Sequence, residues 1–66
     1  MKYKYQTQFE RLPLGLIFER HGYIYRKKSS RTAEIIRPTE YAGTWFYFSA
    51  SELANIEKKD IQNLGV

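Results

Sequence analysis

The first nine residues alternate between larger, less polar side chains and strongly polar ones. One set is Tyr3, Tyr5, Thr7 and Phe9, and the other is Lys2, Lys4, Gln6 and Gln8. A side chain that changes character at every second residue is typical of a strand with one face on a core and the other in water. The alternation recurs, with more apolar residues, nearly to position 48. The pattern therefore predicts a small β domain.

The length of the chain limits how that domain can be stabilised. It has 66 residues and no cysteine, so we expect one domain over residues 1–66, without disulfides or a zinc site built on thiolates. A domain this short buries only about 60% of the surface that its unfolded form exposes. Six tyrosines, four phenylalanines and one tryptophan are available for the core, and each buried ring removes about 150–250 Å² from water.

Five short strands follow from the alternation and from the turn residues between them. Pro13 and Gly15 favour one turn, His21–Gly22 reads as the tip of a β-hairpin, and Pro38 ends a strand because it cannot donate to a ladder. The expected strands cover residues 2–9, 16–20, 23–27, 33–36 and 44–48. Their spacing of about ten residues predicts a mainly β fold, a small five-stranded antiparallel barrel or sandwich.

The last seventeen or so residues differ from this pattern. Ser49 and Glu52 have the spacing of a capping box, and good helix formers follow them. We expect a short helix over residues 50–59, from Ala50 to Lys59, with a last edge strand over Leu53–Ile56 as the alternative. Residues 62–66 are expected to fray.

Nothing in the composition predicts export or a membrane span. The N-terminal lysines are not followed by the apolar run of a signal peptide, and the apolar stretches at residues 14–18 and 45–48 are too short to cross a bilayer. Together with the lack of cysteine, this favours a cytoplasmic protein that does not bind a membrane.

The residues for most kinds of catalysis are missing. His21 is the single histidine, the seven acidic residues are scattered, and the four glycines are too far apart to form a phosphate-binding loop. A His–Cys pair or a two-histidine metal site cannot be assembled within one chain. We therefore expect a protein that is not an enzyme, with no catalytic residues, no metal and no cofactor.

Binding residues are better represented. The formal charge is +4 and the pI is near 9.5, which favours an acidic partner. Long cationic side chains at the end of a hairpin can reach phosphates from a rigid base. The basic candidates for a binding surface are Arg26, Lys27, Lys28, Arg31 and Arg37.

Four consecutive aromatic residues provide the other candidates. In a strand, Phe46 and Phe48 share one face while Trp45 and Tyr47 share the other. We assign the phenylalanines to the core because they have no polar atom, which leaves Trp45 and Tyr47 partly exposed and able to bind. The alternative is that these two rings cover a second small core under the C-terminal segment.

Three spaced motifs resemble a pattern found in small phage and prophage proteins. They are Phe9-x-x-Leu12-x-x-Gly15-x-x-Phe18, then Gly22-x-x-Tyr25-x-Lys27-x-Ser29, then Thr32-Ala33. The resemblance covers residues 9–48 and implies a β-rich fold of the small-barrel kind, with no catalytic residues to transfer. The loop at 38–43 and the aromatic residues at 45–48 depart from that pattern.

Two functions therefore stand beside each other. The favoured one is a phage or mobile-element accessory protein that binds a host protein through Trp45 and Tyr47. The alternative is a small nucleic-acid-binding β-barrel that uses the basic hairpin and the same rings. Both a monomer and a homodimer joined through the edge of the first strand are compatible with the sequence.

Overall fold

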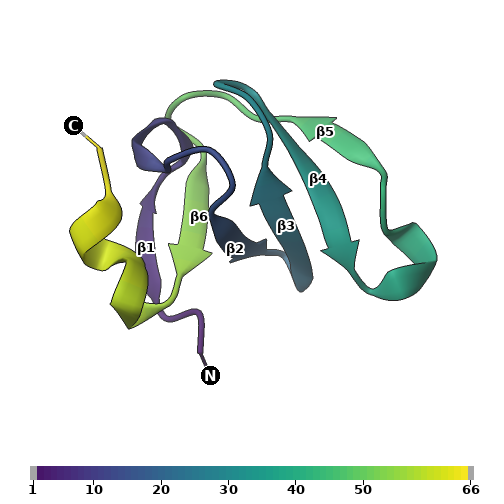
Figure 1. Cartoon of the computed structure of the whole chain (residues 1–66), viewed down its shortest axis with the longest axis horizontal. Coiled ribbons are helices and arrows are strands. Elements are labelled where there is room, and N and C mark those ends of the chain that lie inside the picture. Colours follow the sequence, from purple (N-terminus) through teal and green to yellow (C-terminus); the bar gives the residue numbers. More distant parts are fainter. Residues whose placement is uncertain (1, 66) are drawn as a thin grey trace.

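The computed structural model describes residues 2–65 and consists of one open, fully antiparallel sheet (Figure 1). Six strands lie in the order β1-β6-β2-β3-β4-β5. Their bounds are Tyr5–Gln8 (β1), Ile17–Arg20 (β2), Tyr23–Lys27 (β3), Thr32–Arg37 (β4), Trp45–Tyr47 (β5) and Leu53–Ile56 (β6). Three short 3-10 helices complete the fold, at Phe9–Arg11 (η1), Thr39–Tyr41 (η2) and Lys58–Asn63 (η3). In the part described, no helix is long and apolar enough to cross a membrane.

The mainly β prediction is confirmed, but the barrel, the sandwich of two sheets and the count of five strands are wrong. A barrel requires the two outermost strands to pair, whereas here β1 and β5 lie at opposite ends of the sheet. The sixth strand is β6, which pairs with both β1 and β2. The alternative of a strand over Leu53–Ile56 is therefore correct, although this strand is internal rather than at an edge.

The helix expected over residues 50–59 is absent because its start signal closes a turn instead. Ser49 N–H donates to Glu52 Oε1 at 2.9 Å, and Glu52 N–H donates to the Ser49 carbonyl at 3.1 Å. Beyond this turn, Ala54 and Ile56 are buried while Leu53 is exposed. That alternation has the period of a strand, and it places both buried residues on the core side of the sheet.

The core lies on one face of the sheet, and four aromatic rings are among its nine buried residues. The rings of Phe9 and Phe48 stack with centroids 4.7 Å apart, and those of Phe18 and Tyr25 stack at 5.2 Å. Rings in such arrangements contribute about 0.5–1.5 kcal/mol per pair beyond their burial. Phe9 belongs to η1, so the segment between β1 and β2 covers the core on the side away from the sheet.

The two edges of the sheet have different neighbours. At the β1 edge, residues of β1 line a shallow hollow together with Ile61 and Leu64 of the C-terminal segment, and η3 lies beside β1 (Figure 1). Gly65 N–H donates to the Arg11 carbonyl at 2.7 Å, and Arg11 Nε donates to the Gly65 carbonyl at 3.0 Å. These bonds hold Gly65 beside Arg11, whereas the fraying expected for residues 62–66 stays a prediction, with Val66 outside the described residues. At the other edge, β5 lies far from this segment (Figure 1).

Candidate interaction surface

The candidate surface is built on β5, the three-residue strand at one end of the sheet. Its side chains are the most exposed aromatic group of the described chain: Tyr47 is 85% exposed, Trp45 56% and Phe46 45%. We call these three residues the aromatic edge. The prediction that Trp45 and Tyr47 are exposed is confirmed, and the alternative of a second core beneath the C-terminal segment is wrong, because that segment packs at the opposite edge.

Phe46 corrects part of the sequence-based assignment. It does share the core face with Phe48, since it pairs with the buried Ala33 of β4. However, Phe46 stays 45% exposed, and its ring lies against the Tyr25 ring in a T-shaped arrangement, at a centroid distance of 6.1 Å and an interplanar angle of 82°. Phe48 is buried as expected, because the chain bends back at that point toward Phe9 and Phe18.

Trp45 and Tyr47 project from the face opposite the core, here called the outer face. Trp45 lies across from Glu34 of β4, which in turn lies across from Arg26 of β3. Tyr47 lies across from Thr32, and the Lys28 N–H donates to the Thr32 carbonyl at 2.9 Å. Two rows of side chains therefore cross the outer face, each with an aromatic ring at the edge strand and a cation near β3.

The basic candidates separate into three groups in the structure. Arg26, Lys28 and Arg31 are exposed on or beside the β3–β4 hairpin, next to the rows that hold Trp45 and Tyr47. Lys28 is partly neutralised by Glu34, with Nζ and Oε1 3.2 Å apart. Arg37 is exposed at the far end of β4, where it lines a separate hollow with Lys2 and Tyr3.

Lys27 does not belong to the surface, and its assignment as a binding residue is wrong. It is only 4% exposed because it lies on the core face of β3. Its ammonium donates to the carbonyls of Phe9 and Leu12, at 3.0 and 2.7 Å. Burial, followed by the nearby charge of Arg31, lowers the pKa of Lys27 below its ordinary value.

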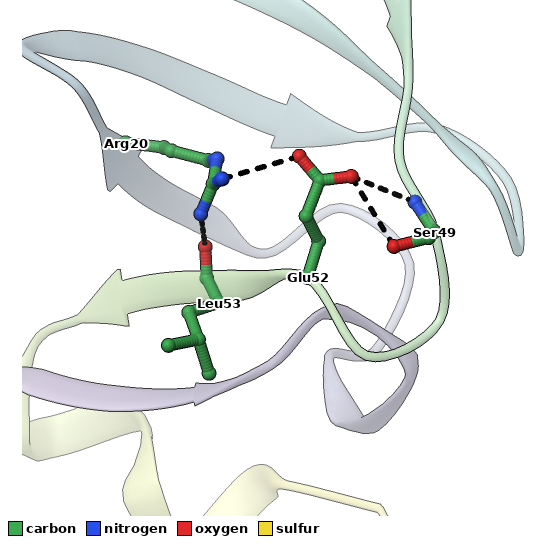
Figure 2. A network of polar contacts seen from close by, with 4 residues as sticks. All are labelled: Arg20, Ser49, Glu52 and Leu53. Carbon is green, nitrogen blue, oxygen red and sulfur yellow. Dashed lines mark hydrogen bonds and ion pairs between the residues drawn. The ribbon is translucent and has the colours of Figure 1, made fainter.

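A network of polar contacts holds the turn that follows β5 (Figure 2). Arg20 at the end of β2 donates to the Leu53 carbonyl, and its guanidinium lies 3.3 Å from Glu52 Oε2. Glu52 also accepts the hydrogen bond from Ser49 N–H. These contacts tie the turn at residues 49–52, which follows β5, to the end of β2.

Two features of this surface were missed by sequence reasoning. Tyr41 of η2 is half exposed and its ring packs against that of Tyr23 in a T-shaped arrangement, with centroids 5.9 Å apart, while its carbonyl accepts from Thr44 N–H just before β5. Glu34 places a carboxylate among the cations of the outer face. Glu34 follows the buried Ala33 in the same strand, so the alternation of faces predicts that its side chain points outward. Comparison of the chain with protein-family models, curated proteins and solved structures finds no match.

Proposed function

We propose that this protein is a small, non-enzymatic interaction module that binds a partner protein through the aromatic edge. The observation that carries the proposal is the exposure of Trp45, Phe46 and Tyr47 on one three-residue strand. Leaving such rings exposed to water is unfavourable for an isolated domain of this size, which needs large apolar residues in its core. Tryptophan, tyrosine and arginine are also the residues that most often dominate the energy of protein interfaces.

The arrangement of charge supports the same reading. Exposed arginines at positions 26 and 31 lie near the two rings, so aromatic anchors would be surrounded by groups able to pair with a partner's carboxylates. The resemblance to small phage and prophage proteins adds the proposal that the partner is a host protein.

The test is an affinity purification that compares matched variants. The full chain carrying Trp45→Ala and Tyr47→Ala should lose the partner that the unmodified protein captures, while its melting temperature changes little because both rings are exposed. Tyr5→Ala is the control, since Tyr5 is a partly exposed tyrosine on the opposite edge strand. Equal loss of partner in the control and in the double variant would remove the aromatic edge from the proposal.

A nucleic-acid-binding module is the second candidate, favoured by the row in which Trp45 and Arg26 flank Glu34. Bases stack on exposed rings at about 1–3 kcal/mol each while cations follow the phosphates. Fluorescence of the single tryptophan distinguishes the two functions. Under the favoured proposal, single- and double-stranded oligonucleotides leave the Trp45 emission unchanged at low salt.

Quenching that weakens steeply with salt would instead establish the nucleic-acid function. For six to ten phosphate contacts, affinity should fall by about 10³–10⁵ between 50 and 200 mM salt. Reversing the charge of Lys28 and Arg31 should then abolish the quenching while the fold is kept. Quenching that survives this change would place the nucleic acid elsewhere.

A further inference from the structure

We infer that the free edge of β5 binds an extended, acidic segment of another protein, which adds to the sheet as a further strand. This inference rests on the proposed protein-binding function and specifies how the partner is held. It follows from the direction of the backbone groups of β5, from the difference in what lies beside the two sheet edges, and from the distribution of charge.

The hydrogen-bonding pattern of the β4–β5 ladder fixes which backbone groups are free. Ile35 N–H donates to the Thr44 carbonyl at 2.9 Å, and Phe48 N–H donates to the Arg31 carbonyl at 2.7 Å. Hydrogen-bonded and non-hydrogen-bonded pairs alternate along an antiparallel ladder. Ala33–Phe46, midway between those two pairs, is therefore hydrogen-bonded.

By the same alternation, Glu34–Trp45 and Thr32–Tyr47 are the non-hydrogen-bonded pairs. The N–H and C=O groups of Trp45 and Tyr47 consequently point away from β4, toward the open edge. Groups two residues apart on one side of a strand have the spacing that a neighbouring strand needs, about 6.8 Å at 3.4 Å per residue. The edge thus offers two donors and two acceptors in register for one added strand.

The other edge differs in what lies beside it and in the side chains it carries. The C-terminal segment packs beside β1 and is tied to Arg11 by two hydrogen bonds. Folded proteins commonly cover or shorten sheet edges to prevent pairing with other chains. Here the C-terminal segment lies beside one edge, while the β5 edge carries three aromatic side chains that an added strand would bury.

Charge decides between a second copy of this chain and an acidic partner. Residues 23–48, which contain β3, β4 and β5, include five cationic residues (Arg26, Lys27, Lys28, Arg31 and Arg37) and two carboxylates (Glu34 and Glu40). The remainder of the chain is almost neutral, with six cationic and five acidic residues. A second copy would bring two positively charged ends together, whereas an acidic segment is attracted to this end.

Strand addition of this kind gives affinity through the main chain and selectivity through alternate side chains. A residue of the added segment beside Phe46 lies on the core face and is best apolar. Its neighbours lie on the outer face beside Trp45 and Tyr47, where the field of the hairpin cations favours carboxylates. The preferred segment therefore alternates acidic and apolar residues.

The test titrates the ¹⁵N-labelled full chain with a blocked nine-residue peptide that alternates glutamate and valine. Before addition, the amide of Phe46 should exchange slowly with solvent and those of Trp45 and Tyr47 rapidly. The acidic peptide should slow the exchange of these two amides, and a peptide with lysine in place of glutamate should bind at least about tenfold more weakly. Sedimentation of the free chain should show a monomer.

Backbone variants separate strand addition from contact with the side chains alone. Tyr47→Ala removes the ring but keeps the outward N–H, whereas Tyr47→Pro also removes that N–H without breaking the ladder to β4. The proline variant should bind about tenfold more weakly than the alanine variant. Circular dichroism checks that both fold, and the exchange experiment on the unmodified chain stands independently if one does not.

The possible failures are distinguishable. Strand addition would be overturned if the peptide shifted the Trp45 indole signal while the Trp45 and Tyr47 amides still exchanged rapidly. Equal binding by the Ala and Pro variants would overturn it too. Either result would leave the aromatic edge as an interface formed by side chains alone. A dimer that protects the same amides would overturn the acidic partner in favour of a second copy. Absence of any response to the acidic peptide would overturn this inference, while the proposed function is decided by the partner captured in the affinity purification.

Discussion

Replacement of Lys27 by methionine tests whether a buried ammonium holds the segment that covers the core. Lys27 reaches from the end of β3 to the carbonyls of Phe9 and Leu12, in and next to η1. Its Nζ also lies 4.5 Å from the centre of the Phe9 ring. The carbonyl of Phe9 keeps a second donor, the N–H of Leu12 at 3.1 Å. The substitution therefore affects the Leu12 carbonyl most, because that carbonyl loses the hydrogen bond from the Lys27 ammonium.

The expected magnitude follows from these contacts. Hydrogen bonds to a charged group contribute about 1.5–3 kcal/mol each, and methionine forms neither. It keeps the length and apolar contacts of the lysine stem, and it removes the cost of burying a charge, the same cost that lowers the pKa of Lys27. We expect a net loss of about 2–3 kcal/mol in the free energy of unfolding.

A loss of that size is measurable in a domain of 66 residues, whose total stability is about 3–10 kcal/mol. Urea unfolding followed by circular dichroism gives the free energy, and the melting temperature should fall by about 10–20 °C. Lys28→Met is the matched control, because Lys28 makes only a partly exposed ion pair with Glu34 and should cost less than about 1 kcal/mol. A Lys27→Met protein as stable as the control would refute the structural role of the ammonium.

Substitutions at three further positions test the turns and the core. At the tip of the β2–β3 hairpin, His21 has a φ of +52°, so His21→Asn should raise stability by up to about 1 kcal/mol in urea unfolding, because asparagine tolerates that conformation better; a loss would contradict this reason. Glu52→Ala should cost about 1–2 kcal/mol, and Glu52→Gln, which can still accept from Ser49 N–H, should recover most of it in the same assay. Burial raises the pKa of Tyr25 above 10.0, so its contribution is complete below pH 10 and is lost as the pH rises through the raised value. The difference in stability between the unmodified protein and Tyr25→Phe should therefore stay constant below about pH 10 and move in favour of the phenylalanine variant above it, and a difference that does not change with pH would refute this reasoning.

The parts of the fold that the sequence predicts are the local ones. The β2–β3 hairpin is confirmed with its turn at His21–Gly22, where both residues have positive φ. Phe18 and Tyr25 are buried in the core, and alternation within a short strand is enough to place such side chains on one face. These features depend only on neighbours within a few residues.

The errors arise where distant segments decide the outcome. Glu52 bonds back to Ser49 N–H both at a helix start and in the turn seen here, so the spacing alone does not distinguish them. β6 forms a strand between β1 and β2. The local sequence does not show that these two distant strands lie on either side of it. Lys27 is buried because the carbonyls of Phe9 and Leu12, more than fourteen residues away along the chain, accept its ammonium.

The same distinction applies to the candidate surface. Alternation correctly separates Trp45 and Tyr47 from Phe46 and Phe48 by face, since the parity of a strand is a local property. It does not show how far the core extends across the sheet. Phe46 and Phe48 share a parity, but Phe46 lies on the last strand, where no further layer covers it, and it stays half exposed.

The shortness of β5 bears on what the aromatic edge can do. A short edge strand is one of the ways in which proteins limit unwanted pairing, and three residues leave only the outward groups of Trp45 and Tyr47 for a neighbour. Hydrogen bonds alone would then hold an added strand weakly, at about 0.5–1.5 kcal/mol net for each. Useful affinity requires the rings of Trp45, Phe46 and Tyr47 to be buried in the same event. Main-chain pairing and aromatic burial therefore have to act together, and a partner that satisfies only one of them should bind poorly.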